Sequence, residues 1–262
     1  MDLGRTIFSW LTGFARIGSF LSASVAGLVL LGWLLDIEVL KRILPGFVAM
    51  NPAAAVAFVL AGIALWGRSS QFNDAIGPSS RDRLLWKIAP ACALIIGSIG
   101  TLKLVGLLLG WEAGIDQILF HDKLAGSGAD LPNRMAPNTA VNFVLLGVSL
   151  WFVGRTSRVM GALPHLLAIL VGLVSWLAII GYVYGAASLY GIRSFIPMAL
   201  HTATLFLILS LGILSLQPDR GLMGILTHAG AGGQIARRML PAMILIPSAF
   251  GWLWLLGGKQ GW

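Results

Sequence analysis

The chain has very few charged residues: they make up 11% of its 262 positions, whereas hydrophobic residues make up 57%. An ordinary soluble domain carries about 25% charged residues. A soluble core could not absorb this excess of apolar side chains, so the composition excludes an ordinary soluble domain. Apolar runs close to the roughly 20 residues that a helix needs to cross a bilayer recur along the whole chain.

Cysteine is almost absent, because Cys92 is the one cysteine and it lies inside an apolar run. This excludes disulfides within the chain and cysteine-based metal or haem motifs. Lipid leaves only helices and closed barrels as membrane-spanning structures. The apolar runs are continuous rather than alternating, so the sequence predicts an all-α polytopic membrane protein and not a β-barrel.

Acidic residues are also scarce, with 10 against 18 Lys and Arg, which gives a net charge of +8. The basic residues sit between apolar runs and form no single basic face, so they indicate membrane orientation rather than nucleic-acid binding. We expect one transmembrane domain over residues 1–262. Its seven predicted helices are 15–35, 51–67, 87–109, 136–154, 162–184, 197–216 and 238–257.

The loops between these helices predict the topology. Eleven basic residues fall on one side and six on the other when Lys103 is left aside. The positive-inside rule then predicts that the N-terminus lies in the cytoplasm. The segment after the seventh helix is expected on the opposite side.

One short pattern occurs three times, with methionine, alanine, phenylalanine and a small residue at offsets 0, 5, 8 and 12. Its methionine, phenylalanine and small residue are Met50, Phe58 and Gly62, then Met135, Phe143 and Gly147, then Met198, Phe206 and Ser210. Pro52 and Pro137 suit a first helical turn, where the missing N–H costs nothing. The small residues would let neighbouring helices approach closely.

The helix before each of these segments ends in a glycine and an aromatic residue, and a fourth such pair is Gly251 and Trp252. The sequence therefore predicts pseudo-repeated helical hairpins over 15–67, 87–154 and 162–216, followed by a half unit over 238–257. An eighth helix would complete the fourth unit.

These features resemble the multi-helix N-terminal sensor region of bacterial hybrid histidine kinases and of related PAS and GGDEF signalling proteins. The matching segments are the three Met-initiated helices and residues 114–120, 188–191, 218–223, 232–233 and 237–241. The resemblance implies an input module in the bacterial inner membrane that passes a signal to a cytoplasmic output domain, with the segment after the seventh helix in the periplasm. The chain departs from the pattern, because these residues contain neither the eighth helix nor an output domain.

The expected function is accordingly a non-enzymatic sensory input module. No kinase, protease or nucleotide-binding motif occurs, and the glycine-rich stretch 229–233 lacks the Lys-Ser or Lys-Thr pair of a phosphate loop. The competing interpretation is an accessory structural subunit of a larger respiratory or photosynthetic membrane complex. Both interpretations predict protein partners on the apolar helix faces and no nucleic acid.

His201 stands where the other two copies have Ala53 and Asn138. A histidine there could titrate or hold a cofactor or metal. Because no second ligand has metal-site spacing, the favoured interpretation is that His201 caps or hydrogen-bonds a neighbouring helix. The methionines that start the repeats could converge on copper(I), but packing is the favoured interpretation and no metal is predicted.

Lys103 is the one charge well inside a predicted span, which makes it a functional candidate. The favoured interpretation is a lysine that snorkels toward the interface and forms a structural ion pair. Its possible partners in the outer loops are Asp36, Glu38, Glu112 and Asp116. Those acids could instead form an outer pocket for a cation or another ligand.

Overall fold

A computed structural model describes residues 3–44, 46–72, 79–110, 115–120, 123, 133–154, 158–185, 197–218, 221–227 and 230–259. Every regular element in these ranges is helical, which confirms the all-α prediction. Four helices are long and apolar enough to cross a membrane: Trp10–Leu35, Pro52–Phe72, Ser80–Leu108 and Gly161–Tyr184. Pro137–Phe152 and Leu200–Leu216 are shorter apolar helices. Glu112 lies outside the described residues.

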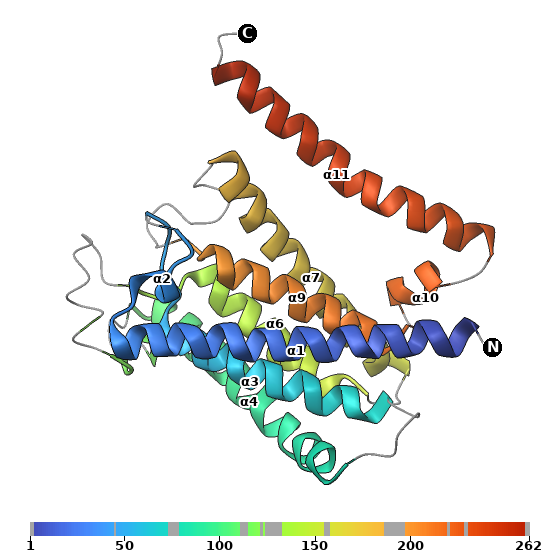
Figure 1. The fold of residues 1–262 in the computed structure, drawn as a ribbon, viewed down its shortest axis with the longest axis horizontal. Coiled ribbons are helices and arrows are strands. Elements are labelled where there is room, and N and C mark those ends of the chain that lie inside the picture. Colours follow the sequence, from blue (N-terminus) through green and yellow to red (C-terminus); the bar gives the residue numbers. More distant parts are fainter. Residues whose placement is uncertain are drawn as a thin grey trace.

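Six helices form a closed bundle (Figure 1). They are α1 (Leu3–Leu35), α3 (Pro52–Ser69), α4 (Ser80–Leu108), α6 (Pro137–Phe152), α7 (Arg158–Tyr184) and α9 (Leu200–Leu216). Each packs on the next in this order, and α9 packs back on α1. Helices α3, α6 and α9 also contact one another, so they form the inner layer, and α1, α4 and α7 form the outer layer.

The other elements are short, except for the last helix. They are α2 (Glu38–Lys41), the 3-10 helices η1 (Ser70–Phe72) and η2 (Ile115–Gln117), α10 (Gly221–Thr227) and α11 (Ala231–Lys259). Helix α11 packs chiefly on α10 and α7, and Figure 1 shows it running outside the bundle. The Tyr184 hydroxyl of α7 donates a hydrogen bond to the Ser248 carbonyl of α11.

The three inner helices begin in the same way. Their N-cap residues are Asn51, Ala136 and Ala199, with φ of −64°, −64° and −65° and ψ of 139°, 147° and 147°. Pro52 and Pro137 occupy the first turn, as expected. The three starts share one end of the bundle with residues 36–44, 46–50, 115–120 and 133–136, and we call it the helix-start end.

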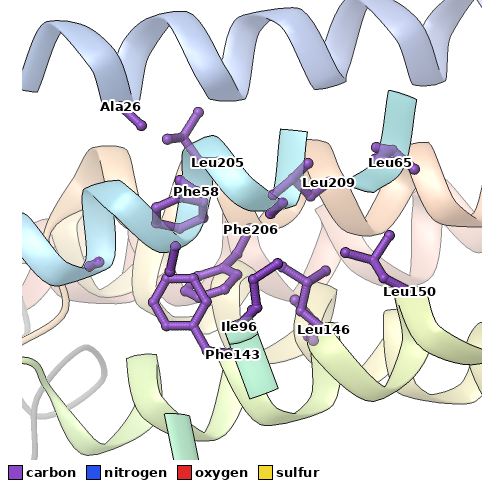
Figure 2. Packing of buried hydrophobic residues seen from close by; sticks show 14 of the residues in the cluster. Ala26, Phe58, Leu65, Ile96, Phe143, Leu146, Leu150, Leu205, Phe206 and Leu209 are labelled. Atoms are coloured by element: carbon purple, nitrogen blue, oxygen red, sulfur yellow. The ribbon is translucent and has the colours of Figure 1, made fainter. Parts of the chain in front are cut away.

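Three phenylalanines fill the centre of the bundle. Phe58, Phe143 and Phe206 are each 0% exposed. Their ring centroids are 5.0 Å apart for Phe58 and Phe143, and 4.7 Å apart for each pair that includes Phe206. Figure 2 shows the three rings in contact between the inner helices. Each inner helix therefore contributes one ring to a single aromatic cluster.

Small residues allow each inner helix to approach the outer helix that precedes it. A Cβ on Gly62 would lie 2.6 Å from the Ser19 carbonyl oxygen of α1, and a Cβ on Gly147 would lie 2.6 Å from the Gly97 nitrogen of α4. In the third pair, Ser210 lies against Gly172 of α7. The expectation of close approach at Gly62 and Gly147 is confirmed.

Candidate functional site

Buried polar and charged side chains gather at the helix-start end. Asn51, Lys103, Asp116 and His201 are all at most 6% exposed there, and they come from different elements. Buried charges and polar groups cost free energy unless they are paired. Their contacts therefore define the best candidate site in the described part of the chain.

Lys103 of α4 and Asp116 of η2 form a buried ion pair. The Lys103 Nζ lies 2.7 Å from Asp116 Oδ2, and the side chains are 7% and 0% exposed. The ion pair expected of Lys103 is therefore present, and its ammonium is enclosed by protein. Packing between α4, α3 and α6 covers this face of α4, which apolar sequence alone could not indicate.

Asp116 also holds the start of α6. Its Oδ2 accepts a hydrogen bond from the Met135 N–H at 2.7 Å, one residue before the N-cap. A carboxylate at this position is favourable because the helix N-terminus carries partial positive charge. The second carboxylate oxygen, Oδ1, is buried and has no partner among the described residues. One carboxylate thus joins α4 to α6.

Asn51 joins the start of α3 to the same network. Its side-chain oxygen accepts from the Ala53 N–H at 2.9 Å, and its Nδ2 donates to the Asp116 and Asn133 carbonyls at 3.1 and 3.2 Å. The Asn133 Nδ2 in turn donates to the Ala49 carbonyl at 3.0 Å. No role for Asn51 was predicted from the sequence. Asparagine is a typical N-cap residue and proline is typical of the first helical turn, so the Asn51-Pro52 pair could have predicted this cap.

Two aromatic side chains hold two of the repeated methionines through their main chain. Trp33 Nε1 of α1 donates to the Met50 carbonyl at 2.9 Å, and the Tyr182 hydroxyl of α7 donates to the Met198 carbonyl at 2.8 Å. The side chains of Met50, Met135 and Met198 are at most 3% exposed. Their main-chain contacts and burial support packing and positioning.

Asp36 and Glu38 are engaged by basic side chains. Lys41 Nζ lies 3.2 Å from Asp36 and 3.1 Å from Glu38, and Lys123 Nζ lies 2.7 Å from Asp36. Hydrogen bonds from Lys123 and Lys41 hold the pKa of Asp36 below its ordinary value, and the hydrogen bond from Lys41 lowers the pKa of Glu38. These two acids form ion pairs here, which disfavours an open cation pocket.

His201 is the second residue of α9 and is 6% exposed. Neither of its ring nitrogens has a hydrogen-bond partner among the described residues. The expected hydrogen bond to a neighbouring helix is therefore not formed. No group of three His, Cys, Asp or Glu side chains in the described ranges is arranged to hold a metal ion.

The arrangement can respond to charge. Removal of the Asp116 carboxylate would leave the Lys103 ammonium uncompensated inside the bundle, and breaking such a pair costs about 3–5 kcal/mol. The same carboxylate positions α6, so its loss would also release the Met135 N–H. The charge state of this pair therefore determines whether the start of α6 stays attached to α4.

Neither a family model, nor a curated protein, nor a solved structure matches this chain.

Proposed function

We propose that this chain is a non-enzymatic, multi-pass module of the bacterial inner membrane that receives a signal at its helix-start end. The observation that carries the proposal is the buried Lys103–Asp116 pair, which ties α4 to the start of α6. The resemblance to the sensor regions of hybrid histidine kinases supports the same role. The partner of the module would be a cytoplasmic output domain that receives the signal.

Seven transmembrane helices fit this arrangement. Helices α6 and α9 have 16 and 17 residues, or about 24–26 Å at 1.5 Å per residue, which is shorter than a roughly 30 Å hydrocarbon layer. They are inner helices packed against α1, α4 and α7, so their ends can be covered by protein rather than lipid. Length therefore does not disqualify them.

The seventh span would be the part of α11 after Arg237 and Arg238, because residues 239–258 carry no charge. The two arginines suit the anionic cytoplasmic leaflet. With the eleven-to-six distribution of basic residues, this supports a cytoplasmic N-terminus and a periplasmic helix-start end. The hairpin repeat is supported by the three similar helix starts and by the phenylalanine cluster.

A sensor requires that the two ends of the bundle be energetically coupled, whereas a structural subunit does not. Hydrogen exchange of the full chain in lipid nanodiscs tests this requirement. In Asp116→Asn we expect faster or slower amide exchange in residues 221–240, as well as at the helix-start end. Glu38→Gln, which alters an exposed carboxyl at the same end, is the matched control and should leave 221–240 unchanged.

Exchange that changes only near Asp116 would argue against the sensor and favour the structural subunit. If Asp116→Asn does not fold, the double variant Lys103→Met with Asp116→Leu replaces both charges by apolar groups and serves instead. Buried ion pairs replaced in this way often retain or gain stability.

A further inference from the structure

An apolar groove of about 480 Å³ runs along the outside of the bundle between α4 and α6. Its lining extends from Ala93 to Leu102 on α4 and from Val144 to Phe152 on α6. At 1.5 Å per residue the groove is about 12–14 Å long, which is close to half of a roughly 30 Å hydrocarbon layer. Figure 1 shows α4 on the side of the bundle away from α11. The groove therefore matches one lipid leaflet in length.

A glycine keeps the groove open. Gly97 belongs to its lining, and a Cβ on this residue would meet nothing within 4 Å. Leu94 and Leu102, also in the lining, are 61% and 55% exposed. The Thr101 hydroxyl donates to the Gly97 carbonyl at 2.8 Å, so its hydrogen-bonding capacity is already used within α4. The wall is thus mostly apolar, which suits a hydrocarbon chain.

Basic side chains continue the line of the groove toward the start of α4. The helix is continuous from Ser80 to Leu108, and Lys87 precedes Leu94 by seven residues, or about two turns. Arg83 precedes Lys87 by four residues, which places it on the same face one turn further. Both basic residues are exposed. One face of α4 therefore carries the groove and, beyond its end, two positive charges.

The depth of Lys87 suits a lipid headgroup. Lys87 lies about 9 Å along the helix axis from Ala93, where the groove begins, at 1.5 Å per residue. The polar region of each leaflet is roughly 5–8 Å thick, so Lys87 is at headgroup level when Ala93 is at the edge of the hydrocarbon. Trp86 is 44% exposed beside it, and indole rings prefer this level. A phospholipid with one chain in the groove would place its phosphate beside Lys87.

The charge at this end of α4 is positive. Residues 80–90 contain three basic residues, Arg81, Arg83 and Lys87, and one acid, Asp82. The Asp82 carboxylate is engaged in the capping box with Ser79. Lys87 forms no ion pair with another residue in the described part of the chain. A basic segment at a membrane surface attracts anionic headgroups, so the lipid that fits best is an anionic one.

We infer that the groove between α4 and α6 binds one acyl chain of an anionic phospholipid, whose phosphate is held by Lys87. Along α4 the charge precedes the apolar groove, in the same order as phosphate and chain within one phospholipid. In the proposed orientation this end of α4 lies at the cytoplasmic leaflet. The inference depends on α4 crossing the membrane, for which its length and apolarity suffice, and not on whether the chain receives a signal.

The test uses the full chain in mild detergent, titrated with dioleoylphosphatidylglycerol or with dioleoylphosphatidylcholine. These lipids have the same chains and differ in headgroup charge, and native mass spectrometry counts the bound molecules. We expect the first phosphatidylglycerol to bind more tightly than the first phosphatidylcholine. Lys87→Gln should weaken phosphatidylglycerol binding about fivefold, the effect of one basic residue at a membrane surface, and leave phosphatidylcholine binding unchanged.

Two matched controls separate this site from general effects. Arg81→Gln removes the same charge from the same end of α4, but Arg81 lies about 120° around the helix from Lys87 and should leave phosphatidylglycerol affinity nearly unchanged. Gly97→Leu fills the groove and should abolish the tight binding of phosphatidylglycerol. Gly27→Leu adds the same side chain at a glycine of α1 where a Cβ also meets nothing within 4 Å, and it should retain that binding.

Equal affinity of the wild type for the two lipids would overturn the inference, as would equal effects of Lys87→Gln and Arg81→Gln. Unchanged binding in Gly97→Leu would do the same, and a wild-type dimer that Gly97→Leu alone dissociates would assign the groove to a second copy of the chain. Lys87→Gln alters an exposed side chain and serves if Gly97→Leu does not fold. None of these results bears on the coupling between Asp116 and residues 221–240, which tests the proposed function separately.

Discussion

The indole N–H of Trp33 donates to the main-chain carbonyl of Met50, with 2.9 Å between nitrogen and oxygen. The bond runs from the end of the outer helix α1 to the residue that precedes the inner helix α3. Tyr182 and Met198 make the corresponding contact between α7 and α9. Trp33 is also covered by the Lys41 ammonium, 4.7 Å from its ring centroid. One side chain thus fixes both the turn and the charged loop above it.

The first prediction is that Trp33→Phe lowers the free energy of unfolding by about 1–3 kcal/mol, because the Met50 carbonyl is left buried without this donor. Thermal or steric-trap unfolding in detergent measures the change. Trp10→Phe is the control, since Trp10 is 76% exposed and should lose little. Equal effects of the two substitutions would argue against a role for the hydrogen bond.

The second prediction concerns the Lys103–Asp116 pair. Lys103→Met and Asp116→Leu should each cost about 3–5 kcal/mol, because each leaves one charge buried alone. The double variant should be more stable than either single variant. A double-mutant cycle of unfolding free energies provides the measurement, and simple additivity of the two effects would contradict the buried pair.

The approximate positions of the long helices were predictable, because continuous apolar runs mark them in the sequence. The predicted ends differ most on the side opposite the helix-start end: α1 begins at Leu3 rather than residue 15, α4 at Ser80 rather than 87, and α11 at Ala231 rather than 238. On that side the helices extend beyond the apolar runs into polar residues. The end of a helix is determined by backbone hydrogen bonding and capping residues and not by apolarity. Ser79 and Asp82 form such a capping box.

The candidate site was predictable only in part. Asp116 was one of four acids considered for Lys103, and the choice among them depends on how η2 folds back against α3 and α4. The spacing of residues along the sequence does not predict how a loop folds back against the helices. The burial of His201 without a hydrogen-bond partner likewise depends on tertiary packing, including that of α9 against α1, a contact between the last and first helices of the bundle.

The third prediction is that the phenylalanine cluster couples the inner helices. Phe58→Leu and Phe143→Leu should each destabilise the bundle, and the pair should show a coupling energy of about 0.5–1.5 kcal/mol, the range for aromatic contacts. Phe58 with Leu150, an inner-helix residue without this ring contact, provides a comparison cycle. Coupling no larger than in that comparison would remove the aromatic contact as a source of stability.

The fourth prediction tests orientation. In a Cys92→Ala background, cysteine at the exposed residue Glu38 should react with an impermeant thiol reagent in intact cells, and cysteine at the exposed residue Arg83 should react only after lysis. The reason is that basic residues concentrate on the Arg83 side and hold it in the cytoplasm. The reverse labelling pattern would invert the topology and place the helix-start end in the cytoplasm.

The fifth prediction uses two glycines at one helix contact. A Cβ on Gly147 of α6 would lie 2.6 Å from the Gly97 nitrogen and 2.7 Å from the Ala93 carbonyl oxygen, whereas a Cβ on Gly97 of α4 meets nothing within 4 Å. Backbone atoms cannot move aside as a flexible side chain can, so Gly147→Ala must separate α6 from α4. Inside lipid, helix association depends on van der Waals fit, and there is no hydrophobic effect to compensate for a lost close contact.

Gly147→Ala should therefore cost about 1–3 kcal/mol, the usual range for overpacking. Gly97→Ala should be neutral or slightly stabilising, because alanine is the better helix former by about 1 kcal/mol. Unfolding free energies of the two variants in the same detergent give the comparison. Both changes add one methyl group, at Gly147 toward the backbone of the neighbouring helix and at Gly97 into open space. The difference between the two unfolding free energies therefore measures the cost of the blocked contact. Equal effects would mean that α4 and α6 do not meet on the Gly147 face.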